Sequence, residues 1–122
     1  IYEYPELTPD QRHEVWRRLE KQYRPHLNME GMPFFEKGGF WQRQHHIYST
    51  PFYYIDYCLA QICALQYKLM MEQDYERAWK SYLKLCRMSA SGFFTDMIRD
   101  VGLLNPLEEE CIQQLIQQLS GE

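Results

Sequence analysis

Helix-start signals constrain the fold of this chain more than any other feature of its sequence. Three times a side chain that can cap a helix stands directly before a proline: at Thr8-Pro9, Thr50-Pro51 and Asn105-Pro106. The capping side chain accepts a hydrogen bond from an unpaired N–H of the first turn, and proline suits the first helical position. Asp74 is a fourth candidate cap, and apolar residues recur at helical spacing after each of these signals. The pattern predicts an all-α chain.

The periodicity divides the chain into about five helices, in an orthogonal or bundle-like packing. We expect the first helix at 9–24, because Pro25 disfavours helical backbone at the residue before it. The other expected helices cover 51–72, 75–88, 91–101 and 106–120. Helix 51–72 is apolar or aromatic nearly all round, so we expect it to be central and largely buried. Glycines and prolines interrupt the periodicity over 26–50, which predicts a packed segment with short helical turns.

Composition excludes several classes of protein. The chain has 122 residues, which is the length of one domain, and its 45% hydrophobic content excludes a disordered tail. A net charge of −4 argues against a nucleic-acid partner, which usually needs a basic patch. No uncharged apolar stretch reaches the about 18 residues of a membrane helix, so we expect no membrane association.

Because the chain begins at Ile1 and is rich in clustered tyrosine, we expect a piece of a larger protein. The alternative is a small domain without its first residues.

The four cysteines do not form a recognisable framework. Cys58, Cys63, Cys86 and Cys111 contain no CxxC pair, which argues against a zinc knuckle. All four have apolar neighbours, as buried free thiols do. Free thiols are typical of a reducing compartment, so the sequence predicts a cytoplasmic location.

The segment 40–57 carries the most chemistry in the chain. Tyr54 and Tyr57 are three residues apart on the expected helix 51–72, so their hydroxyls can point the same way. Two convergent phenols can donate hydrogen bonds to a developing oxyanion without ionising, and a histidine just before the helix can add a donor or transfer a proton. The same spacing also fits core tyrosines whose hydroxyls bond to a neighbour, and spacing alone leaves both interpretations open.

Other chemistry has less support in the sequence. His45 and His46 are adjacent and project in different directions, and no third ligand is near, so we expect no metal site here. Asp56 could form an ion pair with Arg43 or act as a catalytic carboxylate. The sequence contains no HExxH, GxSxG, P-loop or GxGxxG motif.

A longer pattern runs through the same region. It consists of Trp41-Gln42-Arg43-Gln44, His46-Ile47, Pro51-Phe52-Tyr53-Tyr54-Ile55-Asp56-Tyr57, Leu59-Ala60-Gln61 and Ala64-Leu65-Gln66. This pattern resembles the C-terminal part of oligoendopeptidase F, a bacterial branch of the thimet-oligopeptidase-like zinc metallopeptidases. The flanking helices are similar too, so the resemblance covers almost the whole chain.

The resemblance implies a fold and a cofactor. In that family a nearly all-α bowl encloses a channel for short peptides, and residues 1–122 would be a single helical segment, the C-terminal part of that catalytic domain. A zinc ion bound by HExxH and a downstream Glu activates water, with the HExxH Glu as general base. Since this sequence has no HExxH, the zinc ligands would lie outside the chain, and the chain alone would be inactive.

The resemblance also implies site residues and partners. By position, His46, Tyr54 and Tyr57 would bind the substrate backbone and stabilise the tetrahedral intermediate. His45 could take the place of His46, and Tyr53 that of Tyr54, so both count as further substrate-binding candidates. The expected partners are short peptides, the remainder of the parent peptidase and, through exposed apolar surface, further copies of the chain. The alternative is a non-catalytic helical interaction module derived from such a peptidase.

Overall fold

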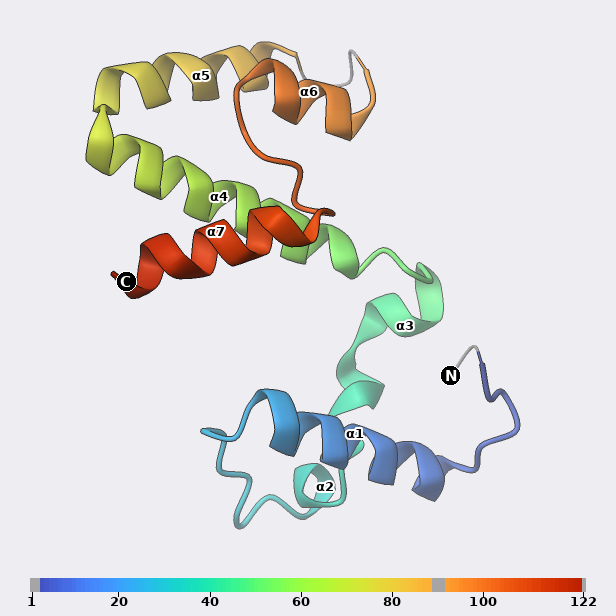
Figure 1. The fold of residues 1–122 in the computed structure, drawn as a ribbon. Coiled ribbons are helices and arrows are strands. Elements are labelled where there is room, and N and C mark those ends of the chain that lie inside the picture. Colours follow the sequence, from blue (N-terminus) through green and yellow to red (C-terminus); the bar gives the residue numbers. More distant parts are fainter. Residues whose placement is uncertain (1–2, 89–91, 122) are drawn as a thin grey trace. The chain divides into compact units, whose positions relative to one another are not determined.

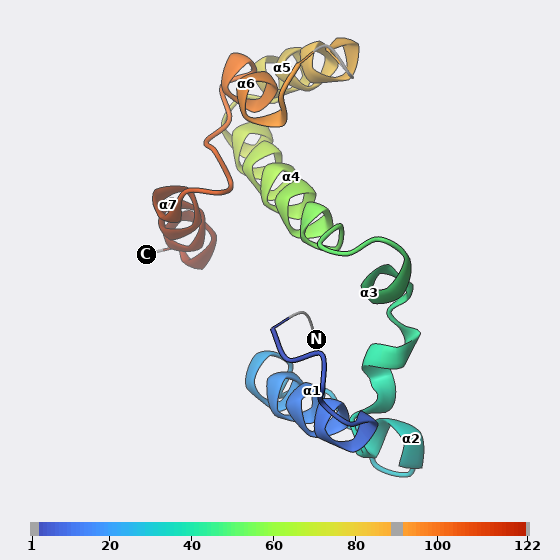
Figure 2. The ribbon, with the colours of Figure 1, turned by 90° about the vertical axis from the view of Figure 1, so that its right-hand side faces the viewer.

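The computed structural model describes residues 3–88 and 92–121, and these residues form helices and turns without strands. They divide into two compact units, Ile1–Tyr54 and Ile55–Glu122 (Figures 1 and 2). The all-α prediction is therefore confirmed, and the expected number of longer helices is present. The described helices of seven or more residues are α1 (Pro9–Tyr23), α4 (Ile55–Gln73), α5 (Tyr75–Arg87), α6 (Phe94–Asp100) and α7 (Glu109–Ser120). Whether residues 1–122 act as a single segment stays a prediction.

Helix α1 begins and ends as its sequence predicts. The Thr8 hydroxyl accepts a hydrogen bond from the Gln11 N–H (3.3 Å), and the Gln11 side chain accepts one from the Thr8 N–H (2.9 Å). This reciprocal capping box uses two of the N–H groups that a helix start leaves unpaired. The last helical residue is Tyr23, and Pro25 follows one residue after the C-cap.

The rest of the first unit consists of short helical turns, as predicted for 26–50. They are α2 (Pro33–Glu36), the 3-10 helix η1 (Gly39–Arg43) and α3 (His45–Ser49). These turns pack through aromatic rings: the Phe40 ring stacks on Trp16 of α1 (centroids 6.2 Å, 14°) and lies 5.5 Å from the Phe35 ring. The guanidinium of Arg24 lies over the same Phe40 ring at 5.2 Å.

Two glycines allow η1 to approach its neighbours closely. Gly38 has a φ of +84°, and a Cβ there would lie 2.1 Å from the His13 carbonyl oxygen of α1. A Cβ on Gly39 would lie 2.6 Å from the Phe34 carbonyl oxygen. Because no side chain tolerates such distances, the packing of η1 against α1 and α2 depends on glycine at both positions.

The second unit has a conventional buried core. Cys63 and Tyr67 of α4 pack with Ile98 of α6 and with Val101 and Leu103, which follow it. Helix α5 begins as predicted, because the Asp74 carboxylate accepts a hydrogen bond from the N–H of Arg77 (3.0 Å).

Polar side chains of α4 and α5 form hydrogen bonds to the end of α6 and to the loop that follows it. From α5, the Ser81 hydroxyl donates to the Val101 carbonyl (2.6 Å) and Lys84 Nζ donates to the Asp100 carbonyl (2.6 Å). From α4, the buried amide of Gln66 accepts from the Leu104 N–H (2.8 Å) and donates to the Leu104 carbonyl (3.1 Å). The loop between α6 and α7 is thereby held by side chains that satisfy its backbone groups.

Helix α4 departs from its prediction at the N-terminal end. It begins at Ile55 instead of Pro51. The Tyr53 N–H donates to the Thr50 carbonyl (3.2 Å), and Phe52 has a φ of +66°, which a right-handed helix does not allow. Pro51 therefore starts a turn and not a helix.

Helix α4 is also less buried than predicted. Its buried residues are Cys63, Gln66 and Tyr67, all in its central part, while Ile55 and Tyr57 in its first turn are exposed. The all-round apolar pattern was therefore misleading, because only one face of α4 is covered by α5, α6 and α7 in this unit.

For the last two helices, the structure agrees with the predicted C-terminal ends better than with the predicted first residues. Gly102 follows α6 with a φ of +83°, and Gly121 follows α7 with a φ of +71°. Helix α7 begins at Glu109 and not at Pro106, because the Asn105 side chain caps a turn by accepting from the Leu107 N–H (3.1 Å). Helix α6 begins at Phe94 and not at the expected Ser91, which itself lies outside the described residues, since the described Gly92 and Phe93 are not helical.

The prediction of four buried thiols is half right. All four cysteines are free, and Cys63 and Cys111 are buried. Cys58 and Cys86 are exposed, because they lie on the outer faces of α4 and α5.

Candidate functional site

A histidine and two tyrosines come together at the end of the first unit. His46 lies in α3, and Tyr53 and Tyr54 follow the turn at Phe52. The centroid of the Tyr54 ring is 4.9 Å from that of His46, and the centroid of Tyr53 is 5.9 Å from it. The turn thus brings both tyrosines that the sequence left as alternatives against the same imidazole.

The residues of the cluster differ in exposure. Tyr54 is 51% exposed and Tyr53 is 45% exposed, whereas His46 is half-buried. His45 is exposed on α3, and its backbone carbonyl accepts a hydrogen bond from the Ser49 hydroxyl (3.1 Å). Of the two adjacent histidines, His46 is therefore the one whose ring is positioned by the tyrosines.

The third predicted residue belongs to the second unit. Tyr57 lies in the first turn of α4 and is 53% exposed. The expectation that Tyr54 and Tyr57 share one helix face is wrong, because Tyr54 precedes the first residue of α4. Both phenols are nevertheless exposed, which does not fit the interpretation of this pair as core tyrosines.

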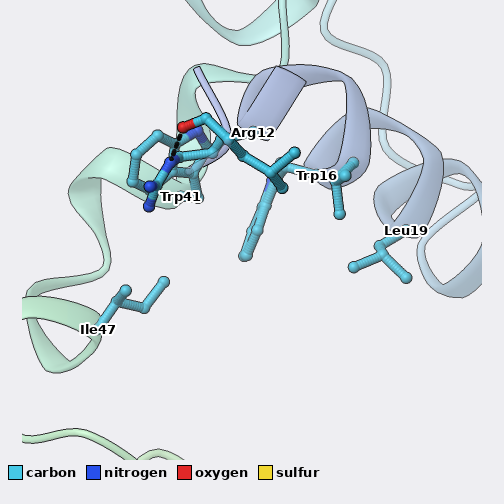
Figure 3. A pocket seen from close by; sticks show the side chains of 7 residues that line it. Arg12, Trp16, Leu19, Trp41 and Ile47 are labelled. Carbon is cyan, nitrogen blue, oxygen red and sulfur yellow. Dashed lines mark hydrogen bonds between the residues drawn. The ribbon is translucent and has the colours of Figure 1, made fainter. Parts of the chain in front are cut away.

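The first unit also holds an apolar hollow of about 250 Å³ lined by α1, the residue Leu7 before it, η1 and α3 (Figure 3). Its lining residues are Leu7, Arg12, Val15, Trp16, Leu19, Trp41 and Ile47. Arg12 is held at its edge, because its Nε donates to the Leu7 carbonyl (2.9 Å). The sequence did not predict this hollow, since Val15 and Leu19 at helical spacing look like ordinary core residues.

Arg43 of η1 makes cation–π contacts within the first unit. Arg43 lies over the rings of Phe35 (5.8 Å) and Phe40 (5.9 Å). Its ion pair with Asp56 stays a prediction. Within 3–88 and 92–121, no three His, Cys, Asp or Glu side chains are grouped as a metal site requires. None of the helices described in these ranges is long and apolar enough to cross a bilayer.

Two solved structures are similar to this chain along 98% of its length. One is PZ peptidase A with an inhibitor, at 45% sequence identity and a TM-score of 0.87. The other is described as an oligoendopeptidase F, at 40% identity and a TM-score of 0.86. The chain is similar to a segment of these peptidases. It spans 21% of the length of each. No protein-family model and no curated protein matches it.

The resemblance to oligoendopeptidase F that the sequence predicts is therefore confirmed. The similarity includes the fold as well as the sequence. The two TM-scores are 0.87 and 0.86, and the sequence identities are 45% and 40%. The roles of His45, His46, Tyr53, Tyr54 and Tyr57 stay predictions.

Proposed function

We propose that this chain forms a substrate-binding wall in the active site of a peptidase that cleaves short peptides. The observation that carries the proposal is the position of the Tyr54 and Tyr53 rings beside the His46 ring, in a chain similar to two peptidases. The ring centroids are 4.9 and 5.9 Å from that of His46. An imidazole and phenols on an exposed turn offer hydrogen bonds to a peptide backbone.

Each side chain has a definite task in this proposal. The Tyr54 hydroxyl donates a hydrogen bond to the carbonyl oxygen of the scissile peptide as negative charge develops there. The His46 imidazole, oriented by the tyrosine rings, supplies a second donor to the same oxygen or holds a proton for transfer. Tyr57 provides a further phenol donor, and Tyr53 and His45 contact the peptide backbone beside the reacting bond.

The resemblance also implies a catalytic zinc ion. The described residues offer no group that fits such an ion, so its ligands would belong to residues outside this chain. When bound, zinc would activate the attacking water. The tasks of His46, Tyr54 and Tyr57 do not depend on that ion, and the isolated chain would bind peptides without cleaving them. Four free thiols support a reducing, cytoplasmic location for the parent peptidase.

The test uses the complete peptidase that carries this segment, with a quenched fluorescent peptide as substrate. Tyr54→Phe removes one hydrogen-bond donor and keeps the ring, and loss of such a donor costs about 100- to 1000-fold in kcat. The melting temperature should stay unchanged, because Tyr54 is 51% exposed and the variant keeps its ring.

Tyr48→Phe is the matched control. Tyr48 is an exposed tyrosine of the same segment, and its ring stacks on Trp41 at 6.0 Å, away from the assigned tasks. Its variant should keep wild-type kcat and KM. A Tyr54→Phe variant that loses stability but keeps its turnover would overturn the proposal and show a structural role for this phenol.

A further inference from the structure

An arginine without a carboxylate partner lies at the edge of the apolar hollow in the first unit. Arg12 lines this hollow (Figure 3), and two of its guanidinium N–H groups bond within the chain. Its Nε donates to the Leu7 carbonyl (2.9 Å) and its Nη2 donates to the Pro5 carbonyl (2.7 Å). None of the ion pairs formed within 3–88 and 92–121 includes Arg12. Its Nη1 group and its full positive charge are therefore left for an anion from outside these residues.

The two hydrogen bonds hold the Arg12 guanidinium in a fixed position. Carbonyl oxygens satisfy these N–H groups but carry no formal charge that would balance the cation. The carboxylate of Asp10, two residues earlier, lies 4.0 Å from Nδ1 of His13 instead. A planar guanidinium that is already positioned loses little further freedom when it forms charge-assisted hydrogen bonds to a carboxylate. Arg12 is thus arranged to bind a carboxylate that its own segment does not supply.

The walls of the hollow favour an apolar side chain beside that carboxylate. Val15 is 37% exposed and Leu19 is 39% exposed, so an apolar group that covers them gains by leaving water. The volume of about 250 Å³ is smaller than the about 300–1,000 Å³ of a site for a drug-sized molecule, and it suits a single residue. The C-terminal residue of a peptide joins a carboxylate directly to a side chain. An internal Asp or Glu would bring the charge without the apolar group.

The position of the hollow connects it with the candidate site. Ile47 lines the hollow and directly follows His46 in α3. Consecutive Cα atoms lie about 3.8 Å apart, so the hollow begins next to the histidine that the proposed function places on the substrate. A peptide bound at His46 therefore needs only a short extension to reach Arg12.

We propose that Arg12 and the apolar hollow bind the C-terminal residue of the peptide substrate. Arg12 pairs with the free carboxylate, and Val15 and Leu19 contact an apolar side chain of the same residue. This inference rests on the proposed peptidase function. It makes the C-terminus a determinant of specificity, so that the peptidase selects short peptides that end close to the cleaved bond.

The experiment measures kcat/KM of the complete peptidase on paired quenched fluorescent peptides that end in leucine. One peptide of each pair has a free C-terminal carboxylate and the other a C-terminal amide, which removes the charge. The distance from the cleaved bond to the C-terminus differs between pairs. At the best distance the wild-type enzyme should prefer the carboxylate about tenfold or more, because the amide loses a hydrogen bond between charged groups. Arg12→Gln should remove this preference by lowering kcat/KM for the carboxylate peptide and leaving the amide peptide nearly unchanged. Arg12→Lys keeps the charge and should keep part of the preference.

Arg18→Gln is the matched control for Arg12→Gln. Arg18 is an exposed arginine of the same helix, α1, and it does not line the hollow. Its variant should keep the wild-type preference for the carboxylate peptide.

Leu19→Gln tests the apolar wall without disturbing the hydrogen bonds of Arg12. Glutamine is as good a helix former as leucine, so the helix should keep its stability. The wild-type enzyme should prefer C-terminal leucine over C-terminal serine about tenfold, and Leu19→Gln should lower this preference severalfold. This arm decides the question if Arg12→Gln fails to fold.

Three results would overturn the inference. They are equal cleavage of the carboxylate and amide peptides by the wild-type enzyme, equal losses on both peptides in Arg12→Gln, and an unchanged leucine preference in Leu19→Gln. A wild-type enzyme that cleaves none of the peptides would overturn the proposed function itself.

Discussion

In the second unit, Cys63 and Tyr67 of α4 pack with Ile98, Val101 and Leu103 in a buried core, whereas in the first unit α1 has no buried residue among Pro9–Tyr23. The first unit packs instead through stacked rings and through the close approach of η1 at Gly38. The second unit therefore derives its stability mainly from buried side-chain volume. The first unit derives it from stacked rings and close backbone contacts. The His46 cluster lies in the unit with the smaller core, and its tyrosines are exposed.

The largest stability effect should follow from removing volume in the second unit. Ile98 is 1% exposed in the core, so Ile98→Ala should lower the free energy of unfolding by about 2–5 kcal/mol, through lost burial and a residual cavity. Urea denaturation followed by circular dichroism measures this. Ile116→Ala is the control, because Ile116 is 59% exposed and its truncation should cost less than about 0.5 kcal/mol. Equal effects would contradict the assignment of the core.

A clash in the first unit should have a somewhat smaller effect. Gly38→Ala places a Cβ 2.1 Å from the His13 carbonyl oxygen at a φ of +84°, so both overpacking and backbone strain oppose folding. The expected loss is about 3 kcal/mol, measured by the same denaturation.

Gly31→Ala separates the two contributions to that loss. Gly31 has a φ of +79°, but a Cβ there would have no atom within 4 Å, so this variant carries the strain without the clash. It should cost about 1 kcal/mol. If Gly38→Ala costs no more than Gly31→Ala, η1 does not pack against α1 as described.

The smallest effect should be a loss of stability in alkaline solution, caused by three buried groups of the second unit. Burial raises the pKa of the Cys63 and Cys111 thiols above 9.0 and that of the Tyr67 phenol above 10.0. Since the folded state favours the neutral forms, their contribution is complete below those ordinary values. It is lost as the pH rises through the raised values. Melting temperatures measured from pH 7 to pH 11 should fall at the alkaline end.

Thiol alkylation provides the control for this prediction. Iodoacetamide at pH 8 should modify the exposed Cys58 and Cys86 before the buried Cys63 and Cys111, as peptide mass spectrometry would show. Equal rates at all four thiols would contradict the buried core of the second unit.

The sequence by itself determined the features that depend on neighbouring residues. The capping box of Thr8 and Gln11, the cap at Asp74 and the glycine stop at Gly102 all follow from groups within four residues of one another. Short-range hydrogen bonds and backbone preferences depend on the types of neighbouring residues. The all-α class and the C-terminal ends of most helices could therefore be predicted from the sequence.

The tertiary structure decided what depends on distant residues or on a single unusual backbone angle. Only the fold pairs Gln66 with Leu104, 38 residues away, and leaves two of four similar thiols exposed. Pro51 looks the same at the start of a helix and at the second position of a turn. The φ of +66° at Phe52 selects the turn, and this one angle removes Tyr54 from α4 and places it against His46.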